Sequence, residues 1–359
     1  MKADIALIGC GRIGFLLEND PLRYKPCTHY GGALSAGLRI SHACDINEKR
    51  LFAFAKKAKI PAENTFLSHH DLFASVKPAM AIIATWTESH ERIAVDAAKN
   101  GVRIIVLEKP IAPSLHQSLK ILKACIKNKT SLIINHERRY DARYRQLKKI
   151  IVSGKIGEMK TVYASILNGG YRGVSNLSEG GGPLLHDGTH IIDTIRFLFG
   201  EIACVQGEFQ RKNRTKGFED RAVAWMKTRS NIDIFLEAGG SRNYFVFELE
   251  ISGSEGKIVI GNGYEKMQLK KKSRLYTGFN DLAEVPFPIY KKNNCFKELY
   301  REAKTILTGK SGGITSTGLD GHKDLEIIHA IYLSSHLKKN INLPLKPGIV
   351  NIAEIFKLK

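Results

Sequence analysis

The chain has 359 residues, of which 43% are hydrophobic and 25% charged, a composition typical of a soluble globular protein with room for two domains. Lys and Arg outnumber Asp and Glu by 55 to 35, a formal net charge of +20 that favours anionic partners, but the basic residues are dispersed and we expect no nucleic-acid binding. No apolar run approaches the roughly 20 residues that cross a bilayer, and none of the six cysteines forms a C-x-x-C pair, so we expect a cytoplasmic protein without a membrane attachment or a zinc ribbon.

Apolar runs in the first 135 residues alternate with segments of helical periodicity. Strands that alternate with helices in this way predict βαβ units and a parallel sheet. We therefore predict an α/β Rossmann domain over residues 1–135. Ligands of such sheets bind beyond the carboxyl ends of the strands. The residues at these ends are Asp45, Thr85, Lys109 and Asn135.

A glycine motif, G-C-G-R-I-G, directly follows the first apolar run. Its glycines allow a tight turn and a close approach of the backbone to a pyrophosphate group, which the start of a helix then holds. A glycine-rich turn without a ligand is the alternative, and the preceding strand argues against it. The cofactor contacts expected here are Gly9, Gly11, Arg12, Ile13 and Gly14.

Asp45 ends the second apolar run, where a carboxylate would accept hydrogen bonds from the adenosine ribose hydroxyls. Because it would repel a 2′-phosphate, we expect NAD as the cofactor, with NADP as the alternative. Asp45 lies 31 residues after Gly14, more than the usual spacing of about 20. Pro21 and Pro26 interrupt any helix in the excess, which predicts an extra loop near the cofactor.

Two further strand ends carry candidate residues. Thr85 and Trp86 are expected beside the nicotinamide, with a plain turn before the helix that begins near His90 as the alternative. After the fourth run, Glu108 and Lys109 precede a proline, which fixes the backbone φ of the turn. A lysine at this place is either a solvated loop residue or a site residue. We include His90, Glu108 and Lys109 among the expected cofactor contacts.

From about residue 158 the pattern changes to short strands separated by turns, with one helix over 187–199 and a long helix near 318–338. This pattern predicts an α+β domain over residues 136–359 with a large, mostly antiparallel open sheet. A sheet with few helices to cover it leaves an apolar face, and such a face is rarely left to solvent. We therefore expect a homodimer or homotetramer.

Three glycines precede a helix that carries His186, Asp187, His190 and Asp193, with positions 186 and 190 one turn apart on the same face. Histidine suits proton transfer near neutral pH, and a neighbouring carboxylate can orient it. A core histidine and half of a zinc site are the alternatives. A zinc site would need a glutamate after the first histidine or a third ligand at a telling spacing, so we expect no metal.

The order of these motifs resembles that of the Gfo/Idh/MocA oxidoreductases. The similar stretches are "LIGCGRIG", "ACD", "ATWTESH", "LEKPIA" and "GGGPLLHDGTHIIDTIRFLFG". The resemblance implies a Rossmann domain followed by an open antiparallel sheet that often forms a dimer surface. It implies that Lys109 is the substrate-binding catalytic lysine and that His190 is the catalytic histidine. Members often have Asp four residues before that histidine, where this chain has His186, so either His186 or the adjacent Asp187 assists His190.

Together, these features predict an NAD(P)-dependent oxidoreductase that transfers a hydride between nicotinamide and the hydroxyl or carbonyl carbon of a sugar, polyol or nucleotide-sugar-like substrate. The charge of Lys109 would stabilise alkoxide character on the substrate oxygen, and His190 would take the proton. Arginines near the substrate suit a phosphate or carboxylate group, and structural ion pairs are their other use. The alternative function is a non-catalytic dinucleotide-binding redox or metabolite sensor. The expected substrate contacts are Asn135, His136, Arg139, Tyr171 and Arg172.

Overall fold

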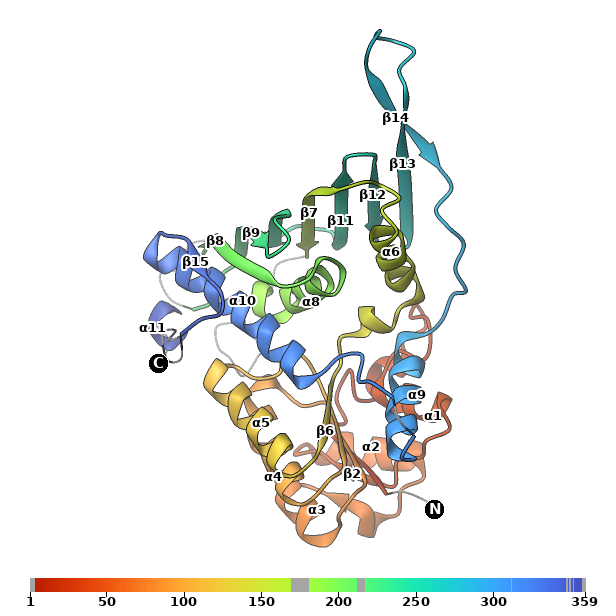
Figure 1. The fold of residues 1–359 in the computed structure, drawn as a ribbon. Helices are drawn as coiled ribbons and strands as arrows, with labels where there is room; N and C mark the ends of the chain where they lie inside the picture. The colour runs from red at the N-terminus through yellow and green to blue at the C-terminus, as the bar shows by residue number, and fades with distance from the viewer. Residues whose placement is uncertain are drawn as a thin grey trace. The chain divides into compact units, whose positions relative to one another are not determined.

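The computed structural model describes residues 4–168, 181–211, 217–310, 312–346, 348, 350 and 352–356. These residues divide into two compact units (Figure 1). Unit 1 comprises the chain up to Asp141 together with Asn293–Lys323, and unit 2 comprises Ala142–Lys292 together with the chain from Asp324 onward. Each unit is built around one β-sheet.

Unit 1 contains a six-stranded sheet in the order β3-β2-β1-β4-β5-β6, in which every neighbouring pair is parallel. Every residue of β1, β4 and β5 is buried, and a strand buried on both faces has a continuous apolar sequence. The predicted Rossmann-type sheet is therefore confirmed. Its strands are β1 (Ile5–Ile8), β2 (His42–Cys44), β3 (Thr65–Phe66), β4 (Met80–Ile83), β5 (Ile104–Leu107) and β6 (Ser131–Ile134).

The strands of unit 1 are connected by helices whose starts are capped by polar side chains. Asn47, Ser68 and Ser114 each accept a hydrogen bond from a backbone N–H in the first turn of the following helix. The helices are α1 (His29–Ser35), α2 (Glu48–Ala58), α3 (His69–Ser75), α4 (His90–Lys99) and α5 (Leu115–Lys127), with short 3₁₀ helices η1 (Leu16–Asn19), η2 (Ala62–Asn64), η3 (Thr87–Ser89) and η4 (Glu137–Tyr140).

The segment after the glycine motif differs in part from the prediction. The extra loop was expected across the whole excess between the motif and Asp45, whereas the structure confines it to residues 20–28 between η1 and α1. Helix α1 can begin beyond Pro26 because the Thr28 side chain accepts a hydrogen bond from Gly31 N at 3.1 Å. The glycine motif is followed by turns and η1, and not by the α-helix expected to hold a pyrophosphate.

Helix α9 (Cys295–Leu307) belongs to unit 1, although the sequence places residues 136–359 together in a second domain. Its apolar face packs into the same hydrophobic core as β1 and β4. Phe296, Leu299 and Tyr300 carry most of this contact, and all three are buried. The chain therefore returns to unit 1 after most of unit 2 has been built.

Unit 2 contains a nine-stranded sheet in the order β14-β13-β12-β11-β7-β10-β9-β8-β15. Only the central pair of β7 and β10 is parallel among the pairs of this sheet that the structure describes, which confirms the mostly antiparallel prediction. The strands are β7 (Met159–Leu167), β8 (Ile202–Gln210), β9 (Arg221–Thr228), β10 (Asp233–Gly239), β11 (Val246–Gly253), β12 (Gly256–Gly261), β13 (Tyr264–Lys272), β14 (Asn280–Val285) and β15 (Ile341–Asn342).

The helices of unit 2 agree with the predicted ones at 187–199 and 318–338. The first is α8 (Gly188–Phe199), and the second is α10 (Gly318–Leu337), whose first turns belong to unit 1. The short helix α7 (Pro183–His186) precedes α8, so His186 and His190 do not share one helix as predicted. The remaining helices are α6 (Ala142–Val152) and α11 (Ile352–Phe356). No helix among the described residues is both long enough and apolar enough to cross a membrane.

One face of the nine-stranded sheet carries exposed aromatic side chains. Burial alternates along β9 and β10, so alternate side chains point away from the core of unit 2. Tyr163 of β7 and Phe235 of β10 are partners in the ladder, and their rings stack with centroids 5.3 Å apart. Their exposed fractions are 51% and 42%.

Candidate active site

The glycine motif forms a tight turn that follows β1 and lies against the end of β4. Gly9 has φ +97°, and a Cβ there would lie 2.5 Å from Ala84 O, so only glycine fits. A Cβ on Gly14 would lie 2.1 Å from Gly9 O. A Cβ on Gly11 would meet nothing within 4 Å, so the backbone is open to a ligand at that point. The turn thus allows the close backbone approach predicted for a pyrophosphate group, but the α-helix start that would hold the group does not follow it.

Asp45 lies at the end of β2 and is nearly buried. Its Oδ2 accepts a hydrogen bond from Cys10 N at 2.8 Å, which ties the carboxylate to the glycine turn. Its Oδ1 accepts from Asn47 N at 2.7 Å and from Arg50 Nη2 at 3.2 Å. The sequence reasoning missed Arg50, which α2 places beside the carboxylate. An arginine at this position can accommodate a 2′-phosphate, so Arg50 is the feature that favours the NADP alternative.

Thr85 and Trp86 follow β4, and Trp86 is 58% exposed. Ser89 Oγ donates to Thr85 Oγ1 at 2.7 Å, a hydrogen bond that links the end of η3 to the residue at the end of β4. His90 is fully buried, with Nδ1 3.0 Å from Pro110 O and Nε2 3.1 Å from Thr85 O. Burial lowers the pKa of His90. The imidazole therefore joins the loops after β4 and β5, which gives it a positioning role.

Glu108 is a buried carboxylate directly before Lys109 at the end of β5. Its Oε1 lies 2.8 Å from His29 Nε2 and accepts from Asn135 Nδ2 at 2.6 Å, and its Oε2 accepts from Lys109 N at 3.2 Å. His29 Nδ1 in turn lies 2.7 Å from the Tyr300 hydroxyl. These contacts join four elements of unit 1, namely α1, α9 and the ends of β5 and β6.

The charge on Glu108 is set by these neighbours. Burial on its own raises the pKa of the carboxyl group, but the hydrogen bond and charge of His29, the charge of Lys109 and the hydrogen bond from Asn135 lower it to about 2. Glu108 is thus anionic at neutral pH. The His29 and Tyr300 contacts could not be predicted, because His29 lies within the predicted loop, where no helix was expected, and Tyr300 lies nearly 200 residues after Glu108.

The expected substrate contacts differ in their surroundings. Asn135 is buried, and its Oδ1 has no hydrogen-bond partner among the described residues. His136 Nδ1 lies 2.9 Å from Ser316 Oγ. Arg139 forms an ion pair with Asp320 at 3.0 Å and donates to Thr315 O at 3.1 Å, which matches the structural use of this arginine. Tyr171 and Arg172 lie outside the described residues.

In unit 2, Asp187 joins the end of α7 to the start of α8. Its Oδ1 lies 2.9 Å from His186 Nδ1, and its Oδ2 accepts from Asn168 Nδ2 at 2.6 Å. His190 follows on α8, half-buried, and its backbone N donates to Asp187 O at 3.0 Å. The two candidate assistants of His190 are therefore hydrogen-bonded to each other. Asp193, one turn after His190, is buried.

Gly182, directly before α7, lies against a carboxylate that sequence reasoning also missed. Glu219 Oε1 accepts from Leu184 N at 2.9 Å and from the Tyr332 hydroxyl at 3.1 Å. A Cβ on Gly182 would lie 2.2 Å from Glu219 Oε2, so a larger residue there would displace the carboxylate. Burial raises the pKa of Glu219 to about 7.

Comparison with known protein families gives matches in both units. Residues 3–136 match the NAD-binding Rossmann fold of the GFO/IDH/MocA oxidoreductase family, and residues 144–259 match the GFO/IDH/MocA C-terminal domain. The chain is 26% identical over 263 residues to an inositol 2-dehydrogenase of Burkholderia cenocepacia and 29% identical over 264 residues to one of Salmonella typhimurium. Each alignment covers 71% of this chain and 73% of the relative.

Solved structures share the fold at lower identity. The WlbA dehydrogenase of Bordetella pertussis, crystallised with NADH and UDP-GlcNAcA, has a TM-score of 0.77 and 22% identity, over 96% of this chain and 100% of that one. The aldose-aldose oxidoreductase of Caulobacter crescentus, crystallised with glycerol, has a TM-score of 0.76 and 20% identity, over 96% and 100%. These structures confirm the predicted fold, and the family matches confirm the oxidoreductase class and the NAD cofactor.

Proposed function

Because the chain belongs to the Gfo/Idh/MocA oxidoreductases, we propose that it transfers a hydride between NAD and the CH–OH carbon of a sugar, polyol or nucleotide-sugar-like substrate. The observation that carries the proposal is the buried, anionic Glu108, which accepts the backbone N–H of Lys109 and so fixes the lysine at the carboxyl end of β5. A solvated loop lysine needs no such support. A non-catalytic sensor would not need it either, so the geometry favours the enzyme.

The residues of unit 1 would bind the cofactor and polarise the substrate. The turn at Gly9, Gly11 and Gly14 would hold the pyrophosphate, and Asp45 would accept from the adenosine ribose. When bound, NAD supplies the hydride acceptor. Lys109 would donate to the substrate oxygen and stabilise its alkoxide character, and Asn135 Oδ1 would accept from a neighbouring hydroxyl.

Unit 2 would supply the proton acceptor. His190 would take the hydroxyl proton of the substrate as the hydride leaves, which a histidine can do near neutral pH. The Asp187 carboxylate holds His186, and we propose that this pair orients His190. Since Arg139 is paired with Asp320, an anionic group on the substrate would have to be bound elsewhere, and Arg172 is the remaining candidate.

Two further features complete the proposal. The exposed aromatic face of β7 and β10 supports a homodimer or homotetramer, because exposed apolar patches mark association surfaces. All six cysteines are free thiols, which supports a cytoplasmic location with its reducing conditions.

A substrate screen tests the proposal directly. The enzyme would be mixed with NAD, or with NADP, and with inositols, aldoses, polyols and nucleotide sugars, and reduced nicotinamide would be followed by its absorbance. We expect turnover with at least one class of substrate and with NAD preferred. Lys109→Ala should abolish most of this turnover while NAD binding, measured by calorimetry, is retained. Full turnover in that variant, or none in the parent enzyme with any substrate class, would contradict the proposal.

A further inference from the structure

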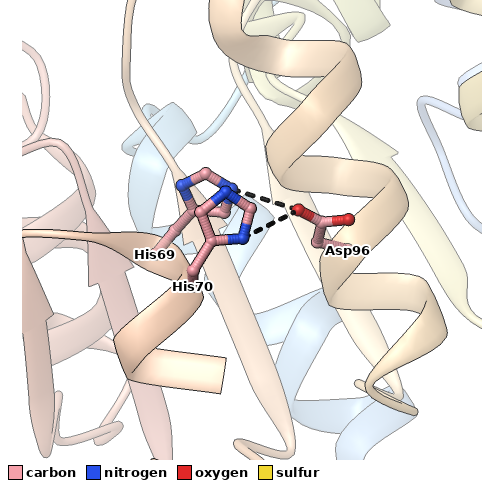
Figure 2. A group of neighbouring side chains, drawn as sticks. All are labelled: His69, His70 and Asp96. Carbon is pink, nitrogen blue, oxygen red and sulfur yellow. Dashed lines mark hydrogen bonds and ion pairs between the residues drawn. The ribbon is translucent and has the colours of Figure 1, made fainter. Parts of the chain in front are cut away.

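Unit 1 carries a cluster of two histidines and an aspartate that the proposed activity does not use. His69 and His70 are the first two residues of α3, and Asp96 lies in the second half of α4. Both imidazole rings point toward the carboxylate (Figure 2). The ring centroids are 4.0 Å apart with an interplanar angle of 38°. We refer to these three residues as the His-His-Asp cluster.

The distances in the cluster are close to those between ligands of one metal ion. His69 Nε2 lies 3.1 Å from Asp96 Oδ2, and His70 Nδ1 lies 3.5 Å from the same oxygen. One ligand atom from each residue lies within 4.8 Å of the others. Ligand atoms of a tetrahedral Zn²⁺ ion, each about 2.0–2.1 Å from the metal, are about 3.3 Å apart. Only a small movement of the side chains would place an ion between them.

The backbone around the cluster is held in place by neighbouring contacts. The His69–Asp96 contact joins residues 27 apart in the chain, and Asn100 Nδ2 donates to Phe73 O at 2.7 Å with the same separation, so α3 and α4 pack with a constant offset. Ser68 Oγ caps α3 by accepting from His70 N at 3.1 Å. The ligand atoms are therefore presented by two helices that are fixed against each other.

The chemistry of the imidazole rings and their access to solvent both suit a bound cation. A neutral imidazole offers a lone pair, whereas two protonated rings stacked this closely would repel each other. The His69 side chain is 8% exposed, but that of His70 is 63% exposed, so an ion can enter from solvent and keep a bound water.

We propose that His69, His70 and Asp96 bind one divalent transition-metal ion of the Zn²⁺ type, which links α3 to α4. Two imidazoles and one carboxylate are the ligands that such ions prefer, and water would complete the tetrahedron. This revises the expectation of no metal, which was reached from the His186–His190 spacing alone. The ligands come from two separate helices, so no sequence motif marks them. None of them belongs to the candidate active site, and the ion would stabilise unit 1 without taking part in hydride transfer.

The test is metal binding by the intact chain after removal of metals with a chelator. Titration with ZnCl₂ in a calorimeter should show one saturable site, and CoCl₂ should give the visible absorption of a tetrahedral complex. Asp96→Asn and His70→Gln should each weaken binding by more than about 10-fold, because loss of even an outer-shell partner typically costs about 10–100-fold in metal affinity. His116→Gln, a change at an exposed histidine of α5, is the matched control and should bind as the parent does.

A second measurement separates lost binding from lost folding. Zn²⁺ should raise the midpoint of thermal unfolding of the parent and of His116→Gln, but not of the two ligand variants, whose NAD affinity should be unchanged. If the parent shows no saturable site, or if its site survives both Asp96→Asn and His70→Gln, the cluster is an ordinary ion pair and the proposal is wrong.

Discussion

Glu108 shows how one buried charge can position another group. A carboxylate in an apolar interior is costly unless donors surround it, and three donors do so here, from His29, Asn135 and the Lys109 backbone. The Tyr300 hydroxyl supports His29 from the other side. Because both ends of this network lie in rigid elements of unit 1, the backbone of Lys109 has little freedom to move. The proposed catalytic lysine is thus positioned through its main chain.

Glu108→Gln should weaken both folding and catalysis. The difference between the ordinary pKa of 4.5 and about 2 here corresponds to stabilisation on the order of 3 kcal/mol at neutral pH. Since the pKa is lower in the folded state, this stabilisation is complete above about pH 4.5 and is lost as pH falls toward 2. The free energy of unfolding, measured with denaturant, should therefore fall less between pH 5 and 3 in the variant than in the parent. Turnover should fall about 10- to 100-fold through displacement of Lys109.

Glu63→Gln is the control, because Glu63 is exposed in η2 of the same unit. It should leave the unfolding free energy and turnover close to those of the parent at every pH. A Glu108→Gln variant that matched this control would show that the buried carboxylate does not position the lysine.

Among the secondary-structure elements, the sequence predicted best those whose pattern of apolar residues directly reflects their burial. Strands β1, β4 and β5 of unit 1 are apolar throughout because both of their faces are covered, so their order along the chain and their parallel pairing could be predicted. Helix α9 could not be assigned to unit 1, because an amphipathic pattern does not say which core it joins. The same limit applies to His29 and Tyr300, which come together only after α9 returns to the first sheet. The sequence shows where the glycines are, but it could not predict that the Glu219 carboxylate packs against Gly182.

Glu219, at the start of α7, should make the free energy of unfolding depend on pH with the sign opposite to that expected for Glu108. Glu219 caps the first turn through Leu184 N, and burial raises its pKa from 4.5 to about 7. A pKa that is higher in the folded state contributes stability below about pH 4.5, and that contribution is lost as pH rises through 7. Relative to Glu219→Gln, which cannot ionise, the parent should lose on the order of 3 kcal/mol of unfolding free energy between pH 4.5 and 8.

Denaturant unfolding of both proteins across this pH range measures the difference directly. Glu208→Gln, at an exposed glutamate of β8, should run parallel to the parent. A constant difference between Glu219→Gln and the parent would mean that Glu219 is already ionised throughout the range, and that Leu184 N and the Tyr332 hydroxyl stabilise its charge more than burial opposes it.

At the scale of the whole molecule, the proposed reaction needs residues from both units. Lys109 follows β5 of unit 1, and His190 lies on α8 of unit 2. A sequence pattern can mark each residue within its own element, as the E-K-P turn and the glycine-led helix do. It cannot show that two elements from different units serve one substrate, because the positions of the units are not encoded in any local pattern. The pairing is therefore a question for kinetics.

If Lys109 and His190 act in one transition state, the losses of turnover caused by replacing each of them should not be independent. Lys109→Ala and His190→Ala should each lower turnover by about 10²–10⁴-fold, the typical cost of losing a positioned acid or base. The double variant should lose far less than the product of the two single losses, because a step already deprived of one partner gains little from the other. NAD affinity should stay near that of the parent in all three variants, since the glycine turn and Asp45 are untouched. Losses that multiply would place the two residues in separate steps, and unchanged turnover in either single variant would remove that residue from the mechanism.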